Sequence, residues 1–318
     1  MRKGVILLAG PTASGKSSVA LALAQQLEDV GGGVIINADS MQVYEELEII
    51  TAQPTFDEKR QVPHKLYGVL GGAERCSVAR WRDMAVTEIN NAHAAGRWPI
   101  VVGGTGLYFK VLQEGIAEIP EIPKNITDDV AAHHATIGAE AFFAELESRD
   151  PDGAARIRST DTQRVLRTAA VLAATGKPLG VWQAEASRDG GLDLPMIRLA
   201  LLPPREIVYA RCDDRLVKMF AGGAQEEVRA LRKLNLHPSL PIMKAVGVPE
   251  ISQLQAGTMD EETALAAAQQ STRRYAKRQM TWIRNQMKDW KIVVEQDSER
   301  KLAEIFAFVR QGVLTEKV

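Results

Sequence analysis

Cysteine is scarce in this chain of 318 residues, which contains only Cys76 and Cys212, and neither lies in a Cys-x-x-Cys or mixed Cys/His pattern. A disulfide framework and a cysteine-built zinc site are therefore not expected. Among the histidines, His133 and His134 are adjacent and would point about 100° apart on a helix, so they cannot readily bind one ion. Two reduced cysteines are typical of a reducing compartment.

Long apolar runs and an excess of charge of either sign are also missing. The apolar run at residues 5–9 is far shorter than the roughly 18 to 20 residues of a membrane span, and it leads into a glycine loop. We therefore expect no membrane association and a cytoplasmic location. With 39 basic and 40 acidic residues, any site for a polyanion must come from local clustering of charge.

The order of short apolar runs and helical periods predicts an α/β fold. Residues 4–9, 34–36 and 99–102 have the pattern of buried strands, and helical segments at 17–28 and 78–95 separate them. Alternating strands and helices imply parallel pairing. Residues 197–202 predict a strand that returns to this sheet, and helices are expected from about 205 onward.

The amino-acid composition changes between residues 113 and 190, where runs of β-branched residues are absent and Ala, Arg and Glu become frequent. Pro120 and Pro123 mark the entrance of this segment, and Gly190 and Gly191 mark its exit. We expect a smaller all-helical domain at 113–190, inserted into a P-loop NTPase-like core of residues 1–112 and 191–318 with C-terminal helices.

Residues 10–17 match the phosphate-loop pattern G-x-x-x-x-G-K-[ST], after a predicted buried strand and before a predicted helix. In such a loop, backbone N–H groups and the positive helix N-terminus face phosphate oxygens. The lysine adds a charge and the last hydroxyl is able to ligate Mg²⁺. The candidate phosphate-binding residues are Gly10, Pro11, Thr12, Ala13, Ser14, Gly15, Lys16 and Ser17.

Two further segments follow predicted strands and should face the same crevice as the phosphate loop. Asp39 follows the second strand. Its carboxylate is a candidate general base, an indirect partner of Mg²⁺ or a helix N-cap. Thr105 lies among the glycines 103, 104 and 106 after the third strand, in a segment that permits close approach to a ligand or makes a tight turn. This strand lacks the terminal acid that serves Mg²⁺ in many kinases and NTPases, which counts against ordinary ATP hydrolysis.

Basic residues gather in two places. Residues 271–288 hold six basic side chains and no acid, with Arg273, Lys277, Arg284 and Lys288 spaced as one helical stripe. Such a stripe suits an RNA backbone or forms a solvated helix face. A second cluster lies in the predicted insertion and contains Arg156, Arg158, Arg164, Arg167 and Lys177.

Together these motifs resemble the bacterial tRNA dimethylallyltransferase family, also called tRNA isopentenyltransferase, over nearly the whole chain. The resemblance rests on the loop at 10–17 and on the segments 39–44, 102–108, 163–169, 227–231 and 275–284, with Arg215 and Met219. It implies that dimethylallyl diphosphate is the donor and that N6 of adenosine 37 in the tRNA anticodon stem-loop is the acceptor, with pyrophosphate released and Mg²⁺ as cofactor. A monomer is expected.

The resemblance also implies roles for individual residues. Asp39 would accept the N6 proton, and Thr105 would contact the target nucleotide or the donor. Ser17 would ligate Mg²⁺. Lys16 and Arg215 would neutralise the diphosphate. The residues implied to contact tRNA are Asp39, Ser40, Met41, Gln42, Thr105, Thr127, Gln163, Arg164, Val165, Leu166, Arg167, Arg274, Lys277 and Arg278.

The chain departs from the family pattern at Gln53, where lysine is usual, and at Lys65, Thr127 and Lys244. Three other functions are consistent with parts of the sequence. They are a small-molecule kinase on the same fold, an adenylate isopentenyltransferase acting on free nucleotide, and a non-catalytic RNA-binding protein with a vestigial phosphate loop.

Overall fold

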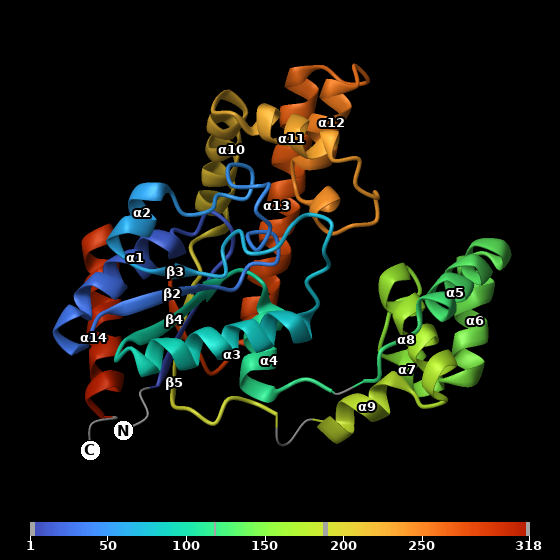
Figure 1. The fold of residues 1–318 in the computed structure, drawn as a ribbon, viewed down its shortest axis with the longest axis horizontal. Helices are drawn as coiled ribbons and strands as arrows, with labels where there is room; N and C mark the ends of the chain where they lie inside the picture. Colours follow the sequence, from blue (N-terminus) through green and yellow to red (C-terminus); the bar gives the residue numbers. More distant parts are fainter. Residues whose placement is uncertain (1–3, 118, 187–189, 316–318) are drawn as a thin grey trace. The chain divides into compact units, whose positions relative to one another are not determined.

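The computed structural model describes residues 4–117, 119–186 and 190–315, and the chain divides into two compact units (Figure 1). The core unit comprises Met1–Lys110 and Asp193–Val318, and the helical unit comprises Val111–Leu192. Within the described residues, no helix is both long and apolar enough to span a membrane.

A parallel sheet forms the centre of the core unit. In the described part of the chain it has six strands in the order β3-β2-β4-β1-β5-β6, and every neighbouring pair is parallel. The strands are β1 (Val5–Ala9), β2 (Gly33–Asn37), β3 (His64–Lys65), β4 (Trp98–Gly103), β5 (Met196–Leu201) and β6 (Lys291–Val293). Because β1, β2 and β4 are buried along their whole length, their sequences are continuous apolar runs rather than alternating ones.

Helices cover both faces of this sheet. On one face, α1 (Lys16–Gln26) and α14 (Ser298–Thr315) lie side by side and share an apolar cluster with alternate residues of the strands (Figure 1). Helix α3 (Val78–Ala94) packs on β2 and β4, and its buried residues lie outside that cluster, so it covers the opposite face. The remaining helices near the sheet are α2 (Phe56–Gln61) and α4 (Gly106–Glu114), with a 3-10 turn at Glu28–Val30.

The C-terminal half of the core unit is helical. Helices α10 and α13 pack together through Val208, Cys212, Ala276 and Met280. Ala13, in the loop after β1, and Leu202, directly after β5, pack against this cluster. The helices are α10 (Arg205–Ala221), α11 (Ala224–Lys233), α12 (Val248–Gln255) and α13 (Glu261–Gln286), with a 3-10 turn at Ile242–Lys244.

The helical unit has its own small core. Phe142, Leu146 and Val165 are buried together, and further apolar side chains of α5, α6 and α8 pack around them. Its helices are α5 (Lys124–Ile137), α6 (Ala139–Arg149), α7 (Pro151–Ala155), α8 (Thr162–Thr175) and α9 (Leu179–Ala186).

The parallel α/β sheet predicted from the sequence is confirmed, with two strands that the sequence did not indicate. β3 has two residues and β6 has three, and both lie at the edges of the sheet. Strands this short carry no readable hydrophobic period, and β6 lies in the region where only helices were expected.

Candidate functional site

The phosphate loop joins β1 to α1 at the carboxyl edge of the sheet, in a conformation suited to anions. Ala13 has φ 60° and Gly15 has φ 85°, both in the left-handed region, which is uncommon for a residue with a Cβ such as Ala13. No side chain caps the N-terminus of α1. Among the described residues, the backbone amides of Ala13, Gly15, Lys16 and Ser17 have no hydrogen-bond partner. These amides and the helix N-terminus together make a nest for negative charge.

Two of the predicted phosphate-binding residues have no backbone N–H group that is free to bind a ligand. Proline has none at position 11, and the Thr12 N–H already donates to Gln279 Oε1 at 2.8 Å. The Thr12 hydroxyl accepts a hydrogen bond from Arg215 Nη2. Any contact of Pro11 or Thr12 with phosphate would therefore not use a free backbone amide, and both residues shape the loop.

Two hydroxyl groups of the loop make no hydrogen bond with any described residue. Ser14 is 2% exposed, and its Oγ lies against Gly10, where an added Cβ would come within 2.6 Å of it. A buried hydroxyl without a partner calls for a ligand oxygen or water. Ser17 lies on the exposed first turn of α1, where its hydroxyl is open to a hard cation such as Mg²⁺.

Two cations and one carboxylate meet beside this loop. Burial lowers the pKa of Lys16 to about 8, Asp39 opposes that shift, and the positive charge of Arg215 adds to it. Lys16 Nζ lies 3.4 Å from the Pro11 carbonyl oxygen. Burial also lowers the pKa of Arg215, an effect that Asp39 counteracts. A pair of partly desolvated cations is poorly compensated in the free protein and is ready to bind a multivalent anion.

The pKa of Lys16 predicts how diphosphate capture depends on pH. Because the free protein holds this pKa near 8, the lysine loses its charge as pH rises through about 8. Capture of the diphosphate donor expected from the sequence, measured as kcat/KM for that donor, should therefore be constant below pH 8 and fall above it. In the complex the bound anion favours the charged lysine, so kcat should fall only at higher pH. A kcat/KM that stays level to pH 9.5 would contradict this assignment.

Asp39 is held by the end of β2. Buried Asn37 donates from Nδ2 to the carbonyls of Asp39 at 3.0 Å and Leu66 at 2.9 Å, and its Oδ1 accepts the Asp39 N–H at 2.8 Å. Asp39 Oδ1 accepts the Met41 N–H at 2.9 Å. No helix begins at this point, so Asp39 is not a helix N-cap, which was one of its predicted alternatives. The carboxylate keeps an oxygen for other partners.

The glycines at the end of β4 and directly after it lie in close contact with neighbouring protein atoms. A Cβ on Gly103 would lie 2.0 Å from the Ala38 carbonyl oxygen, and one on Gly106 would lie 2.1 Å from Trp282 Nε1. Gly104 faces Gln279 in the same way, at 2.1 Å from Nε2. Close approach is therefore the reason for these glycines, and the approaching groups are the end of β2 and the face of α13.

Thr105 is bonded into both neighbouring segments. Its Oγ1 accepts the Ser40 N–H at 3.1 Å, and its own N–H donates to the Ala38 carbonyl at 3.1 Å. Burial raises the pKa of the nearby Tyr275, and the side chains of Thr105 and Gln279 oppose that shift. Thr105 thus lies next to Asp39 in a fixed orientation.

The structure brings Lys16, Ser17, Asp39, Thr105 and Arg215 to one edge of the core unit. This arrangement concentrates positive charge where an anionic leaving group would lie, and it provides a carboxylate able to accept a proton. No group of three or more His, Cys, Asp or Glu residues suited to a metal exists in the described part of the chain. A cation here would rely on Ser17, water and the phosphate oxygens of a ligand.

The predicted basic stripe on α13 is only partly correct. Lys288 lies beyond the last residue of the helix, Gln286, and Arg273 is paired with Asp213 at 2.6 Å. Arg274, Lys277 and Arg278 are exposed and line a groove that Trp282 completes. The guanidinium of Arg278 lies 5.6 Å from the ring centroid of Tyr275. Three of the predicted RNA-contacting cations are therefore available on one surface.

In the helical unit, Gln163, Arg164 and Arg167 are exposed on α8. Leu166 packs partly against the core of this unit, and Val165 is 1% exposed within it. The Val165 side chain is therefore not available to tRNA in this structure, and the predicted contact of this residue would have to use its backbone. Thr127 on α5 is exposed and donates to the Lys124 carbonyl at 2.7 Å.

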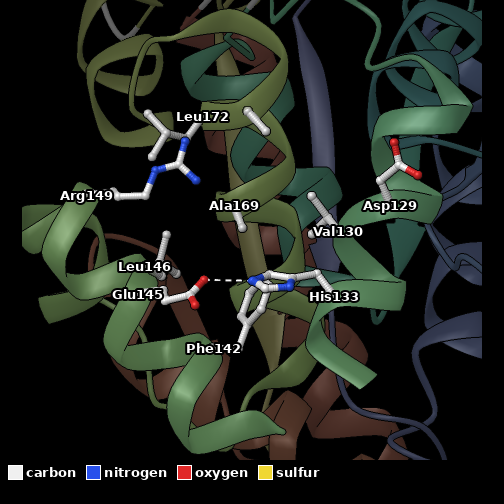
Figure 2. Close-up of a pocket in the computed structure, with 10 residues that line it drawn as sticks. Asp129, Val130, His133, Phe142, Glu145, Leu146, Arg149, Ala169 and Leu172 are labelled. Carbon is white, nitrogen blue, oxygen red and sulfur yellow. Dashed lines mark hydrogen bonds and ion pairs between the residues drawn. The ribbon is translucent and has the colours of Figure 1, made fainter. Parts of the chain in front are cut away.

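A hollow of about 250 Å³ lies between α5, α6 and α8 of the helical unit (Figure 2). His133 and Glu145 face each other across it with Nε2 and Oε2 2.7 Å apart, and Phe142 lies beneath them. None of the sequence-predicted site residues lines it. Its walls are mainly apolar, so it is a packing feature of the small core rather than part of the phosphate site.

The departures from the family pattern have structural explanations in two cases. Gln53 is 8% exposed, and its Nε2 donates to the Tyr44 carbonyl at 2.8 Å and the Leu47 carbonyl at 3.3 Å. The Gln53 amide therefore stabilises the loop that follows Asp39 and is not directed toward solvent. Lys65 is paired with Glu88 at 3.7 Å, and Lys244 is exposed.

Asn37 and Gln279 are site residues that sequence reasoning did not assign. Asn37 could have been found, because it is a polar residue at the end of an apolar strand. Gln279 shares a helical face with Tyr275 and Trp282, at spacings of four and three, which is a signal for one docked surface. Neither pattern reveals which loop such a residue contacts.

Comparisons with known proteins agree on one group. Residues 42–286 match the IPP transferase family. A tRNA dimethylallyltransferase of Rhodospirillum centenum is 50% identical over 283 residues, covering 89% of both chains. One of Sphingopyxis alaskensis is 46% identical, covering 97% of this chain and 99% of the relative.

Solved structures give the same result. The full-length tRNA isopentenylpyrophosphate transferase of Bacillus halodurans superposes with a TM-score of 0.70 at 29% identity, covering 100% of this chain and 98% of that chain. A eukaryotic dimethylallyltransferase acting on tRNA superposes with a TM-score of 0.81 at 26% identity, covering 97% of this chain and 80% of that chain.

Proposed function

The chain belongs to the IPP transferase family, and we propose that it transfers the dimethylallyl group of dimethylallyl diphosphate to N6 of adenosine 37 in tRNA. The chain spans nearly the full length of relatives named for this activity. The observation that supports the reaction most strongly is that Lys16 and Arg215 both bond to the phosphate loop, through Pro11 and Thr12, while Asp39 lies near enough to raise the pKa of both cations. These groups match a reaction that releases pyrophosphate and removes a proton.

In the proposed reaction, the bond between N6 and the first carbon of the prenyl group forms while the bond from that carbon to the diphosphate oxygen breaks. The free amides of the phosphate loop, Lys16 and Arg215 stabilise the charge that grows on the leaving pyrophosphate. Asp39 accepts the proton from N6 as the amine becomes cationic. Thr105, fixed beside Asp39, orients the target nucleotide.

Mg²⁺ is the cofactor proposed for this site. The unpartnered hydroxyl of Ser17 and the oxygens of a bound diphosphate form a donor set of the hard type that Mg²⁺ prefers. When bound, the ion would neutralise negative charge on the leaving group. We expect a chelator to abolish transfer and added Mg²⁺ to restore it, and undiminished transfer in excess chelator would remove the ion from the reaction.

The tRNA is proposed to contact both units. In the core unit, the contacts are Ser40, Met41 and Gln42 beside Asp39, and the exposed Arg274, Lys277 and Arg278 of α13. In the helical unit, they are Gln163, Arg164 and Arg167, with Thr127. Phosphate contacts release counterions, so affinity for tRNA should fall steeply with salt. Affinity that does not change with salt would argue against these basic surfaces.

The proposed setting is a monomer in the cytoplasm. Both cysteines are free, with Cys212 buried and Cys76 partly buried, which fits a reducing compartment. Light scattering of the purified protein and fractionation of the source cells test these two statements. A stable dimer or a membrane-bound pool would contradict them.

The test of the function uses the purified protein with Mg²⁺, dimethylallyl diphosphate and unmodified tRNA, with AMP and ATP as parallel acceptors. Mass spectrometry of the nucleosides is expected to find prenylated adenosine from tRNA only. Prenylated AMP or ATP would instead assign the chain to the enzymes of free nucleotides. Transfer of phosphate from ATP would assign it to the kinases.

A further inference from the structure

Gln279 on α13 is a buried side chain with both ends of its amide bonded to loops of the site. It is 6% exposed, its Oε1 accepts the Thr12 N–H at 2.8 Å, and its Nε2 donates to the Gly104 carbonyl at 3.0 Å. Because an N–H only donates and a carbonyl only accepts, these partners fix the orientation of the amide.

The two bonded residues belong to different halves of the site. Thr12 is in the phosphate loop, and its hydroxyl accepts from Arg215. Gly104 directly precedes Thr105, whose Oγ1 accepts from the segment that begins with Asp39. A single side chain therefore connects the loop that faces the diphosphate with the loop that faces the acceptor base.

The neighbours of Gln279 show that this face of α13 is docked closely. Tyr275, one turn earlier, is close enough to Thr105 and Gln279 for both to lower its pKa, and Trp282, one turn later, lies against Gly106. A Cβ on Gly104 would come within 2.1 Å of Gln279 Nε2. The glycines of the second loop therefore make room for this row of side chains, and Gln279 also bonds to the phosphate loop through Thr12.

We infer that Gln279 is a positioning residue for prenyl transfer, which holds the phosphate loop and the Thr105 loop at the spacing that brings donor carbon and N6 together. This inference rests on the proposed function. Gln279 itself is directed at protein groups, so it acts through Thr12 and Gly104. Misplacement of reacting groups by about 1 Å costs roughly 10²-fold in rate, so the effect should appear in the chemical step.

Gln279→Met tests this role, because methionine has a similar length and helix propensity but no amide. We expect the single-turnover rate with saturating tRNA and donor to fall about 10²-fold, while KM for the donor and Kd for tRNA stay within about threefold. The matched control is Gln269→Met on the same helix, about 15 Å along the helix from Gln279, where Nε2 donates to the Asp213 carbonyl at 3.3 Å. This control should react like the wild type.

A second readout does not depend on activity. Hydrogen exchange of the peptides covering residues 10–17 and 103–107 should accelerate in Gln279→Met and not in Gln269→Met, at equal thermal stability. Gln279→Asn, one methylene shorter, should show the same changes to a smaller extent.

Transfer within threefold of wild type, a loss confined to KM, or unchanged exchange in both loops would each overturn the inference. If the wild type forms no prenylated tRNA, the proposed function fails. The exchange data then still decide whether Gln279 links the two loops.

Discussion

Asp39→Asn is expected to lower the rate of prenyl transfer by about 10² to 10⁴-fold, the range for loss of a general base. Asparagine retains the oxygen that accepts the Met41 N–H, so the turn after β2 should persist. What is lost is the negative charge and the ability to take the N6 proton. Binding of tRNA should therefore survive, and single-turnover kinetics with a tRNA-binding assay separate the two effects.

The same substitution should move the pH profile in a defined direction. Asp39 raises the pKa of Lys16, so its removal lowers that pKa further, and the fall in kcat/KM for the donor should begin below pH 8. Asp57→Asn, on the exposed surface of α2, is the matched control and should change neither rate nor profile. A rate within threefold of wild type in Asp39→Asn would remove Asp39 from the role of base.

Lys16→Met is expected to lower kcat by about 10² to 10³-fold, as for loss of one group that stabilises charge in a transition state. The substitution should also weaken binding of inorganic pyrophosphate, because one positive charge is lost. Binding should not be abolished, because Arg215 and the loop amides remain. Calorimetric titration with pyrophosphate and steady-state kinetics measure the two effects separately.

The thermal stability of Lys16→Met should not fall with its activity. Burial disfavours the charged form of Lys16, and methionine has no such cost, so the melting temperature of Lys16→Met should equal or exceed that of the wild type. Lost activity in a more stable protein is not explained by misfolding. The exposed Lys59→Met serves as control. Normal pyrophosphate affinity in Lys16→Met would show that the anion binds elsewhere.

The parts of the fold that the sequence predicts are those set by local pattern. The strands around Leu7, Ile35 and Val101 are buried on both faces, so each is a continuous apolar run, and the phosphate loop has a fixed spacing. Edge strands β3 and β6 are too short for such a pattern, and they form because a neighbouring strand is already in place.

The parts that the sequence does not reveal depend on partners distant in the chain. Glycine at 103, 104 and 106 indicates close approach, but it does not say whether the approaching group is a ligand, the end of β2 or α13. The pairing of Arg273 with Asp213, on another helix, removes a cation that spacing alone assigns to an RNA surface. The loop pattern likewise predicts that Thr12 binds phosphate, but its backbone N–H donates to Gln279 of α13.

The most direct test of the account is a stoichiometric one. The protein is incubated with dimethylallyl diphosphate and unmodified tRNA, released pyrophosphate is counted, and ribonuclease fragments of the tRNA are sequenced by mass spectrometry. Dimethylallyl transfer to tRNA should yield one pyrophosphate for each prenyl group, with every group on N6 of adenosine 37. Pyrophosphate released without prenylated tRNA, or a prenyl group at another nucleotide, would contradict it.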